Sequence, residues 1–158
     1  MPGRAGVWCV SILAAAAVTA ALASAVPAGG RDAYRNPTPG AAIALQIPGM
    51  HRAVVRRNVV YARRGGRALR LDVYRPAGSK PRVRVPGVLL VHGSTGDPSP
   101  KDWGIYVGWG QLLAARGLAG IPFNHRGDPA DIRAALSAVR TGAVRLGVDG
   151  NRLCVASF

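Results

Sequence analysis

The ordered part of the hydrophobic pattern begins with two short runs, residues 56–63 and 69–74, on either side of Gly65-Gly66. In the second run apolar residues alternate with charged ones, which is the period of a half-buried strand. Glycines in both turn positions accept the positive φ values that a tight hairpin turn requires. The pattern therefore predicts a β-hairpin over residues 56–74.

Beyond Arg75-Pro76 the pattern changes to continuous apolar runs, which are typical of strands buried on both faces. These runs comprise residues 88–91, 118–123 and 152–156. Cys154 lies within the last run and is expected to be a small buried hydrophobic residue.

Two segments with helical spacing of apolar residues separate these strands. The first covers residues 106–116 and stops at Gly117. The second starts at Asp128-Pro129, where the aspartate can cap and the proline suits the first turn, and it continues to Leu146 before Gly147. Residues 148–151 are expected to form a turn.

Strands that alternate with amphipathic helices predict right-handed crossovers and a parallel sheet. The expected fold class is α/β, with an N-terminal hairpin followed by a mostly parallel sheet and flanking helices. The expected domain covers residues 56–158, and residues 26–55, which are rich in proline and glycine, are expected to be an irregular linker.

Residues 1–25 have the features of a cleavable signal peptide. Arg4 precedes an uncharged apolar run over residues 7–22, and Ala23-Ser24-Ala25 fits the small-x-small cleavage pattern. The alternative is a membrane anchor, but the run is short and mostly alanine, so no stable membrane span is expected. The predicted location is therefore periplasmic or extracellular.

The composition and the spacing of residues limit the kinds of site that the chain is expected to form. The chain has 158 residues and a formal charge of +14, with 21 Lys and Arg against 7 Asp and Glu. The three His, two Cys and scattered Asp lack the spacing of metal ligands, so no metal site is predicted. No glycine-rich loop has the form that binds phosphates or dinucleotides, so no cofactor is predicted.

Four segments, in order and spacing, resemble the first half of an α/β-hydrolase, closest to the dienelactone-hydrolase-like and esterase-like exported enzymes. They are Leu69 to Pro76, Pro86 to Gly93, Leu112 to Phe123 and Asp131 to Ser157. The apolar strand ending in His92-Gly93 resembles the family's third strand with its oxyanion loop. Residues 146–153 resemble the run that precedes the nucleophile strand.

The resemblance implies a serine hydrolase that cleaves carboxylic esters through an acyl-enzyme. The family presents its nucleophile in a Gly-x-Ser-x-Gly turn just after this strand, followed in the chain by the acid and the histidine. Aligned in this way, Ser157 is the first small position of the turn, and the nucleophile is expected immediately after Phe158. No catalytic residue of the triad is therefore expected in this chain, which we expect to be a truncated domain without activity alone.

Of the active-site parts that the resemblance implies, only the oxyanion loop is expected within this chain. The backbone N–H groups of Ser94 and Thr95 are the candidate oxyanion donors, and His92 and Gly93 are expected to support the loop. His125 follows a buried strand, at the edge of a sheet where sites form, and is a candidate for substrate contact or for a local hydrogen-bonding role. A small-molecule ester is the implied substrate of the completed domain.

A cluster of basic residues supports an alternative to the serine hydrolase interpretation. Ten Arg and Lys80 lie between Arg52 and Arg84, against a single Asp. The cluster is a solvated hairpin face, or it attaches the chain to an anionic envelope polymer, or it binds nucleic acid. Specific nucleic-acid binding is disfavoured because no recognition motif is present and because the signal directs export. The alternative function is thus a non-catalytic basic module that binds envelope anions.

Overall fold

The computed structural model describes residue 43 and residues 45–80, 83–93 and 99–157. The predicted signal peptide, most of the predicted linker, and Ser94 and Thr95 of the predicted oxyanion loop lie outside these residues.

The predicted hairpin is confirmed. Strand β1 (Val54–Arg64) pairs antiparallel with β2 (Arg67–Arg75), and the turn glycines Gly65 and Gly66 have φ values of 53° and 75°. Two register irregularities interrupt the pairing, and Asn58, with φ 58°, lies in the first of them. Bulges of this kind twist and bend a strand.

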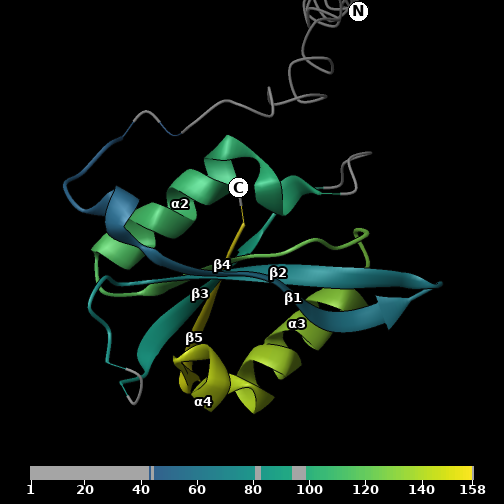
Figure 1. Cartoon of the computed structure of the whole chain (residues 1–158). Coiled ribbons are helices and arrows are strands. Elements are labelled where there is room, and N and C mark those ends of the chain that lie inside the picture. Colours follow the sequence, from purple (N-terminus) through teal and green to yellow (C-terminus); the bar gives the residue numbers. More distant parts are fainter. Residues whose placement is uncertain (1–42, 44, 81–82, 94–98, 158) are drawn as a thin grey trace, which may run out of the picture. The chain divides into compact units, whose positions relative to one another are not determined.

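The rest of the domain alternates strands and helices, as the pattern predicts (Figure 1). The elements are β3 (Val85–Val91), the 3-10 turn η3 (Pro100–Asp102), α2 (Gly104–Ala115), β4 (Ala119–Pro122), α3 (Pro129–Thr141), α4 (Ala143–Leu146) and β5 (Val148–Ser157). Asp128 caps α3 as expected, because its Oδ1 accepts a hydrogen bond of 2.7 Å from Ala130 N.

The five strands form one sheet in the order β1-β2-β4-β3-β5. β3 is parallel to both of its neighbours, β4 and β5, whereas β2 runs antiparallel to β4. The chain moves from β3 to β4 in one direction and from β4 past β3 to β5 in the other. Since both crossovers are expected to be right-handed, their helices must cover opposite faces. Figure 1 shows α2 on one side of the sheet and α3 on the other.

Each face has its own apolar core. Leu71, Val73 and Ile121 lie in the larger cluster, on the side of α3. Leu90 and Tyr106 lie in the smaller one, under α2. Helix α2 approaches the sheet closely at Gly110 and Gly120, where a Cβ on Gly120 would lie 2.6 Å from Gly110 Cα. Glycine is therefore required at this contact.

Four details differ from the sequence-based expectation. The predicted second helix is divided at Gly142 into α3 and α4, which agrees with the low helix propensity of glycine. The predicted turn at 148–151 lies inside β5 as an irregularity, where Asn151 N donates to Asp149 Oδ1. Part of the predicted linker is ordered: the 3-10 turn η2 (Met50–Arg52) buries Met50.

The fourth difference concerns Cys154, whose predicted burial is wrong. Its side chain is exposed. The apolar run 153–156 forms β5 as predicted, but β5 is the last strand of the described sheet, so one of its edges and part of its faces are uncovered.

Candidate active site at the carboxyl ends of β3 and β4

The sheet topology selects one location for a site. The connection from β3 to β4 contains α2 and crosses one face of the sheet. The connection from β4 to β5 contains α3 and crosses the opposite face (Figure 1). In open α/β sheets, ligands bind in the crevice that such a divergence creates at the carboxyl ends of the strands. Here these ends are His92-Gly93 after β3 and Phe123 to His125 after β4.

Two histidines meet at this point, one from each strand end. The rings of His92 and His125 are stacked, with centroids 3.8 Å apart and planes inclined by 12°. His125 N donates to His92 Nε2 at 3.3 Å, and His125 Nε2 lies 3.0 Å from the carbonyl oxygen of His92. The stack therefore ties the end of β3 to the end of β4. The sequence pattern predicted both residues but not their contact.

These contacts fix which nitrogens carry hydrogen. Gly127 N donates to His125 Nδ1 at 2.9 Å, so Nε2 of that ring must carry the proton that His92 O accepts. In the same way, His92 Nε2 accepts from His125 N, so His92 Nδ1 donates to Gly93 O at 2.6 Å. Burial lowers the pKa of His125 below its ordinary value of 6.5, against the opposing effects of His92 O and Asp131.

The lowered pKa of His125 predicts a pH-dependent stability. A histidine that is held neutral in the folded state contributes its full stability above pH 6.5, the ordinary value, and loses it as the pH falls below 6.5 towards the lowered pKa. The free energy of unfolding in urea should therefore be smaller near pH 5 than near pH 7.5, and His125→Gln should reduce that difference.

The control for this experiment is His51→Gln, because His51 is exposed. The carboxylates whose pKa is lowered, those of Asp131 and Asp149, have an ordinary value of 3.8 and act at lower pH. If His125→Gln and His51→Gln retain the same pH dependence as the original chain, the neutral state of His125 is not what stabilises the fold.

Asn124 connects the end of β4 to three other elements, and sequence reasoning missed it. Its backbone N donates to Arg70 O in β2, its carbonyl oxygen accepts from Tyr61 Oη at 2.6 Å, and its Oδ1 accepts from Lys101 N at 3.0 Å. Burial, followed by the Asp131 carboxylate, raises the pKa of Tyr61, so the hydroxyl stays protonated and donates. Asn124 thereby holds β4 against the hairpin and η3.

A buried ion pair anchors η3 to the sheet on the α2 side. Lys101 Nζ lies 3.2 Å from Asp72 Oδ1 and 2.6 Å from Asp102 Oδ1. The side chains of Lys101 and Asp72 are 2% and 0% exposed. Asp72 Oδ1 also accepts from Asn58 N at 2.7 Å, and Arg57 reaches Asp72 Oδ2 at 3.5 Å. Neither Asp72 nor Lys101 was predicted to be buried.

A second carboxylate orders the loop that follows β4. The Asp131 side chain, which is 0% exposed, accepts two hydrogen bonds from the Arg126 guanidinium and one from Arg126 N. The hydrogen bonds from the Arg126 side chain are the main cause that lowers the pKa of Asp131. The loop at His125 is thus held from both sides, by His92 and by α3.

The remaining predicted site residues are placed as follows. Gly93 is exposed, and a Cβ added there would meet nothing within 4 Å, so the backbone has open space beside it. Ser157 pairs with Val91, which brings the ends of β5 and β3 together. The roles proposed for Ser94 and Thr95 remain predictions. Among the described residues, no group of three His, Cys, Asp or Glu could hold a metal ion.

The chain is similar to solved structures but matches no known sequence family. No family model matches the chain, and no curated protein matches it. Among solved structures, the apo form of Thermogutta terrifontis esterase 2 matches with a TM-score of 0.55 and 25% identity, covering 70% of this chain and 43% of that one. The fold is esterase-like.

Further structures of the same esterase give the same result. Its native form matches with a TM-score of 0.54 and 26% identity, over 70% of this chain and 41% of the esterase. Its form phosphorylated by paraoxon matches with a TM-score of 0.53 and 25% identity, over 71% and 44%. This chain therefore spans less than half the length of the esterase that it matches. No helix of the described residues is both long and apolar enough to cross a membrane.

Proposed function

We propose that the chain supplies the oxyanion side of a carboxylic ester hydrolase of the α/β-hydrolase superfamily. The observation that carries the proposal is the esterase-like sheet, in which β3 ends at His92-Gly93 directly beside the end of β5. In an acyl-transfer site, the nucleophile must reach the carbon of the reacting carbonyl while the oxyanion donors reach its oxygen, so both must lie within a few ångströms of the same group. The adjacent ends of β3 and β5 provide such a pair of positions.

The roles divide between this chain and residues that would follow it. The backbone N–H of Ser94, with that of Thr95 as the second candidate, would donate to the developing oxyanion, and the partner donor would be the N–H of the residue after the nucleophile. Each such donor lowers the barrier by about 3–4 kcal/mol. The stacked His92 and His125 would hold the base of that loop, and His125 would lie nearest to the substrate. The nucleophilic serine, its histidine and its acid would come from a segment after Phe158, as in the Gly-x-Ser-x-Gly architecture.

The matched esterase suggests the substrate class. Its structures include forms with bound propionate and butyrate and a form phosphorylated by paraoxon. By analogy, we propose short-chain carboxylic esters as substrates and an organophosphate as a probe of the nucleophile. We also propose that the protein acts outside the cytoplasm, on the basis of the signal-like sequence of residues 1–25.

The test compares the 158-residue chain with one extended along the genomic reading frame beyond the codon of Phe158. The extended chain should hydrolyse p-nitrophenyl butyrate and should gain a diethylphosphoryl group on one serine when treated with paraoxon, as measured by mass spectrometry. The 158-residue chain should do neither. Ester turnover by the 158-residue chain that survives Ser157→Ala would show that the nucleophile has been placed wrongly.

A further inference from the structure

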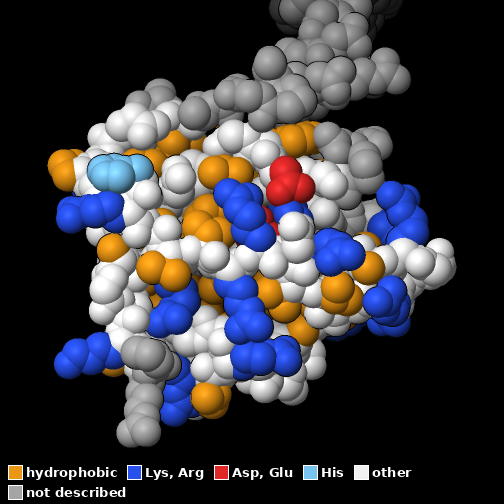
Figure 2. All heavy atoms as spheres, viewed as in Figure 1, with side chains coloured by type: hydrophobic (Ala, Val, Ile, Leu, Met, Phe, Trp, Pro, Cys, Tyr) orange, Lys and Arg blue, Asp and Glu red, His pale blue; other side chains and the backbone are white. Residues whose placement is uncertain are grey.

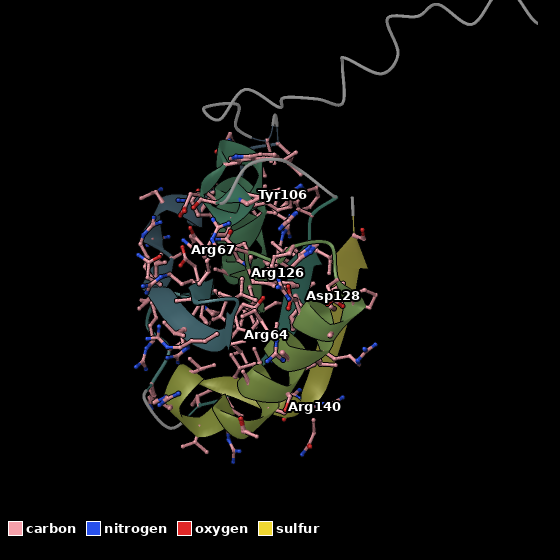
Figure 3. All side chains as sticks on the ribbon, turned by 90° about the vertical axis from the view of Figure 1, so that its right-hand side faces the viewer. Arg64, Arg67, Tyr106, Arg126, Asp128 and Arg140 are labelled. Carbon is pink, nitrogen blue, oxygen red and sulfur yellow. The ribbon has the colours of Figure 1, made fainter. Side chains whose placement is uncertain are left out.

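Three of the seven arginines of the hairpin flank its turn, at one end of the molecule. Because Asn124 N donates to Arg70 O, the part of the hairpin before Arg70 extends past the end of β4. Arg63, Arg64 and Arg67 flank the Gly65-Gly66 turn in this extension, and Arg64 is directly opposite Arg67. Figure 3, which looks towards the hairpin turn, shows Arg64 and Arg67 on the side that faces the viewer.

We refer to Arg63, Arg64, Arg67 and Arg70 as the hairpin arginine surface. All four are exposed, and they lie on both faces of the hairpin, Arg64 and Arg67 on one face and Arg63 and Arg70 on the other. Figure 2 shows Arg and Lys side chains spread over the hairpin side of the molecule, with little acidic surface between them. Partners that stand directly opposite each other across a hairpin have Cβ atoms about 5 Å apart, so their charges repel unless an anion lies between them.

The carboxylates of the described residues are already occupied elsewhere. Each of the five contacts an Arg or Lys side chain, and most of these cations lie outside the hairpin arginine surface. Within the surface, Arg64 reaches Asp131 only at 4.0 Å, and Arg70 donates to the backbone oxygen of Asn58. Among the described residues, no carboxylate forms an ion pair with Arg63 or Arg67.

Protection of a sheet edge accounts for only part of this charge. Charged residues on an edge strand prevent it from pairing with another chain, and β1 is such an edge. Arg70, however, lies where β2 has β1 on one side and the end of β4 on the other, so its charge protects no edge. Arg67 lies beyond the end of β4, where both edges of the hairpin are open, so edge protection accounts for its charge but not for that of Arg70.

We propose that the hairpin arginine surface binds a flexible polymer with closely spaced phosphate groups. A guanidinium presents a planar fork of donors that fits two oxygens of one phosphate, and these charge-assisted bonds are stronger than neutral ones. Arg64 and Arg67 are opposite each other and can be neutralised together by a chain that carries a charge on every short repeat, and a flexible chain that passes over the turn can also reach Arg63 and Arg70 on the other face. This inference is independent of the proposed esterase function.

Other polyanions fit the surface less well. A single-stranded nucleic acid would need exposed aromatic rings for base stacking, but Tyr74 is buried and Tyr61 is half-buried against Phe123. A membrane surface would favour an apolar residue that can insert among the lipids, but residues 63–67 are Arg-Arg-Gly-Gly-Arg.

The test measures binding of fluorescently labelled inorganic polyphosphate to the 158-residue chain by fluorescence anisotropy. Three phosphate contacts should weaken affinity roughly 20-fold between 50 and 200 mM salt, on the slope found for single-stranded polyanions. Arg63→Gln, Arg67→Gln and Arg70→Gln combined should remove most of this dependence and weaken binding at 50 mM salt at least 10-fold.

The matched control is Arg116→Gln, Arg133→Gln and Arg140→Gln combined, which removes the same charge from exposed helix and loop positions. Since charges beyond about 14 Å are largely screened at 50 mM salt, its effect should stay below about threefold. If both triple variants are folded, as judged by circular dichroism, and lose the same affinity for polyphosphate, binding depends on net charge alone and the proposal is overturned. Tighter binding to a DNA duplex, to polyglutamate or to phosphatidylserine vesicles than to polyphosphate would also overturn it.

Discussion

The 158-residue chain is expected to self-associate through β5, and Val155→Lys is expected to shift it strongly towards the monomer. Val155 is 47% exposed and Cys154 beside it is also exposed, although both belong to an apolar strand. Strand β5 pairs with β3 on one side and ends the described sheet on the other. Its free edge therefore offers unpaired backbone groups together with apolar side chains.

The two edges of the sheet differ in a way that locates the interface. The β1 edge carries arginines and two register irregularities, both of which hinder pairing with another chain. Residues 153–157 of β5 carry no charge. A lysine at position 155 would place a charge in the part of β5 that has none, which is the device that natural edge strands use.

Size-exclusion chromatography with light scattering at several protein concentrations provides the measurement. Val144→Lys is the matched control, because Val144 is an apolar residue that is 73% exposed on helix α4 and is not part of strand β5. We expect the original chain and Val144→Lys to elute as oligomers, and Val155→Lys to be mostly monomeric. A monomeric original chain at high concentration would show that the β5 edge is not adhesive.

The elements that the sequence predicted are those whose signal is local. Gly65-Gly66 specifies a turn through backbone freedom, and Asp128-Pro129 specifies a helix start through capping. The alternation over residues 69–74 specifies a strand with one charged face. Each of these signals depends on neighbours in the chain, so the fold class and the order of elements followed from the sequence.

What the sequence could not predict depends on contacts between distant segments. The run 153–156 is apolar enough for a central strand, but whether Cys154 is covered depends on which elements lie beside β5. Lys101 is charged and stands next to Asp102 in a short segment without periodic apolar residues, so the local sequence does not indicate that it is buried. It is buried because Asp72 is 29 positions away in the chain but 3.2 Å away in space. Asn124 is a similar case.

The candidate site shows the same division. His92 and His125 were identified because each follows a buried strand, which is a local property. Their stacking at 3.8 Å follows from the parallel pairing of β3 with β4, which no single segment encodes. The positions of strand ends can thus be predicted from the sequence, whereas the interactions between side chains at those ends require the sheet register.

The largest loss of stability is expected from Asp72→Ala. Removing the carboxylate leaves the Lys101 ammonium, 2% exposed, with Asp102 as its remaining ion-pair partner among the described residues, and it leaves Asn58 N without its acceptor. Breaking a buried ion pair from one side costs about 3–5 kcal/mol when the other charge is left without compensation, and the contact of Lys101 with Asp102 keeps the expected loss at the lower end of that range. The expected midpoint of urea unfolding is therefore far lower than that of the original chain.

Lys101→Met should lower the free energy of unfolding less than Asp72→Ala does, and this order is the specific prediction. The methionine keeps much of the apolar stem of lysine, and the Asp72 carboxylate retains the Asn58 N–H and the Arg57 guanidinium. Asp149→Ala, which breaks an ion pair with Arg152 on the surface, is the control and should change stability little. If Asp72→Ala does not fold, Asp72→Asn preserves an acceptor for Asn58 and allows the same comparison. Equal stability of the Asp72 variant and the Asp149 control would mean that the pair does not hold η3 to the sheet, and the anchoring of the segment before α2 would have to come from other contacts such as Asn124 and the buried Trp103.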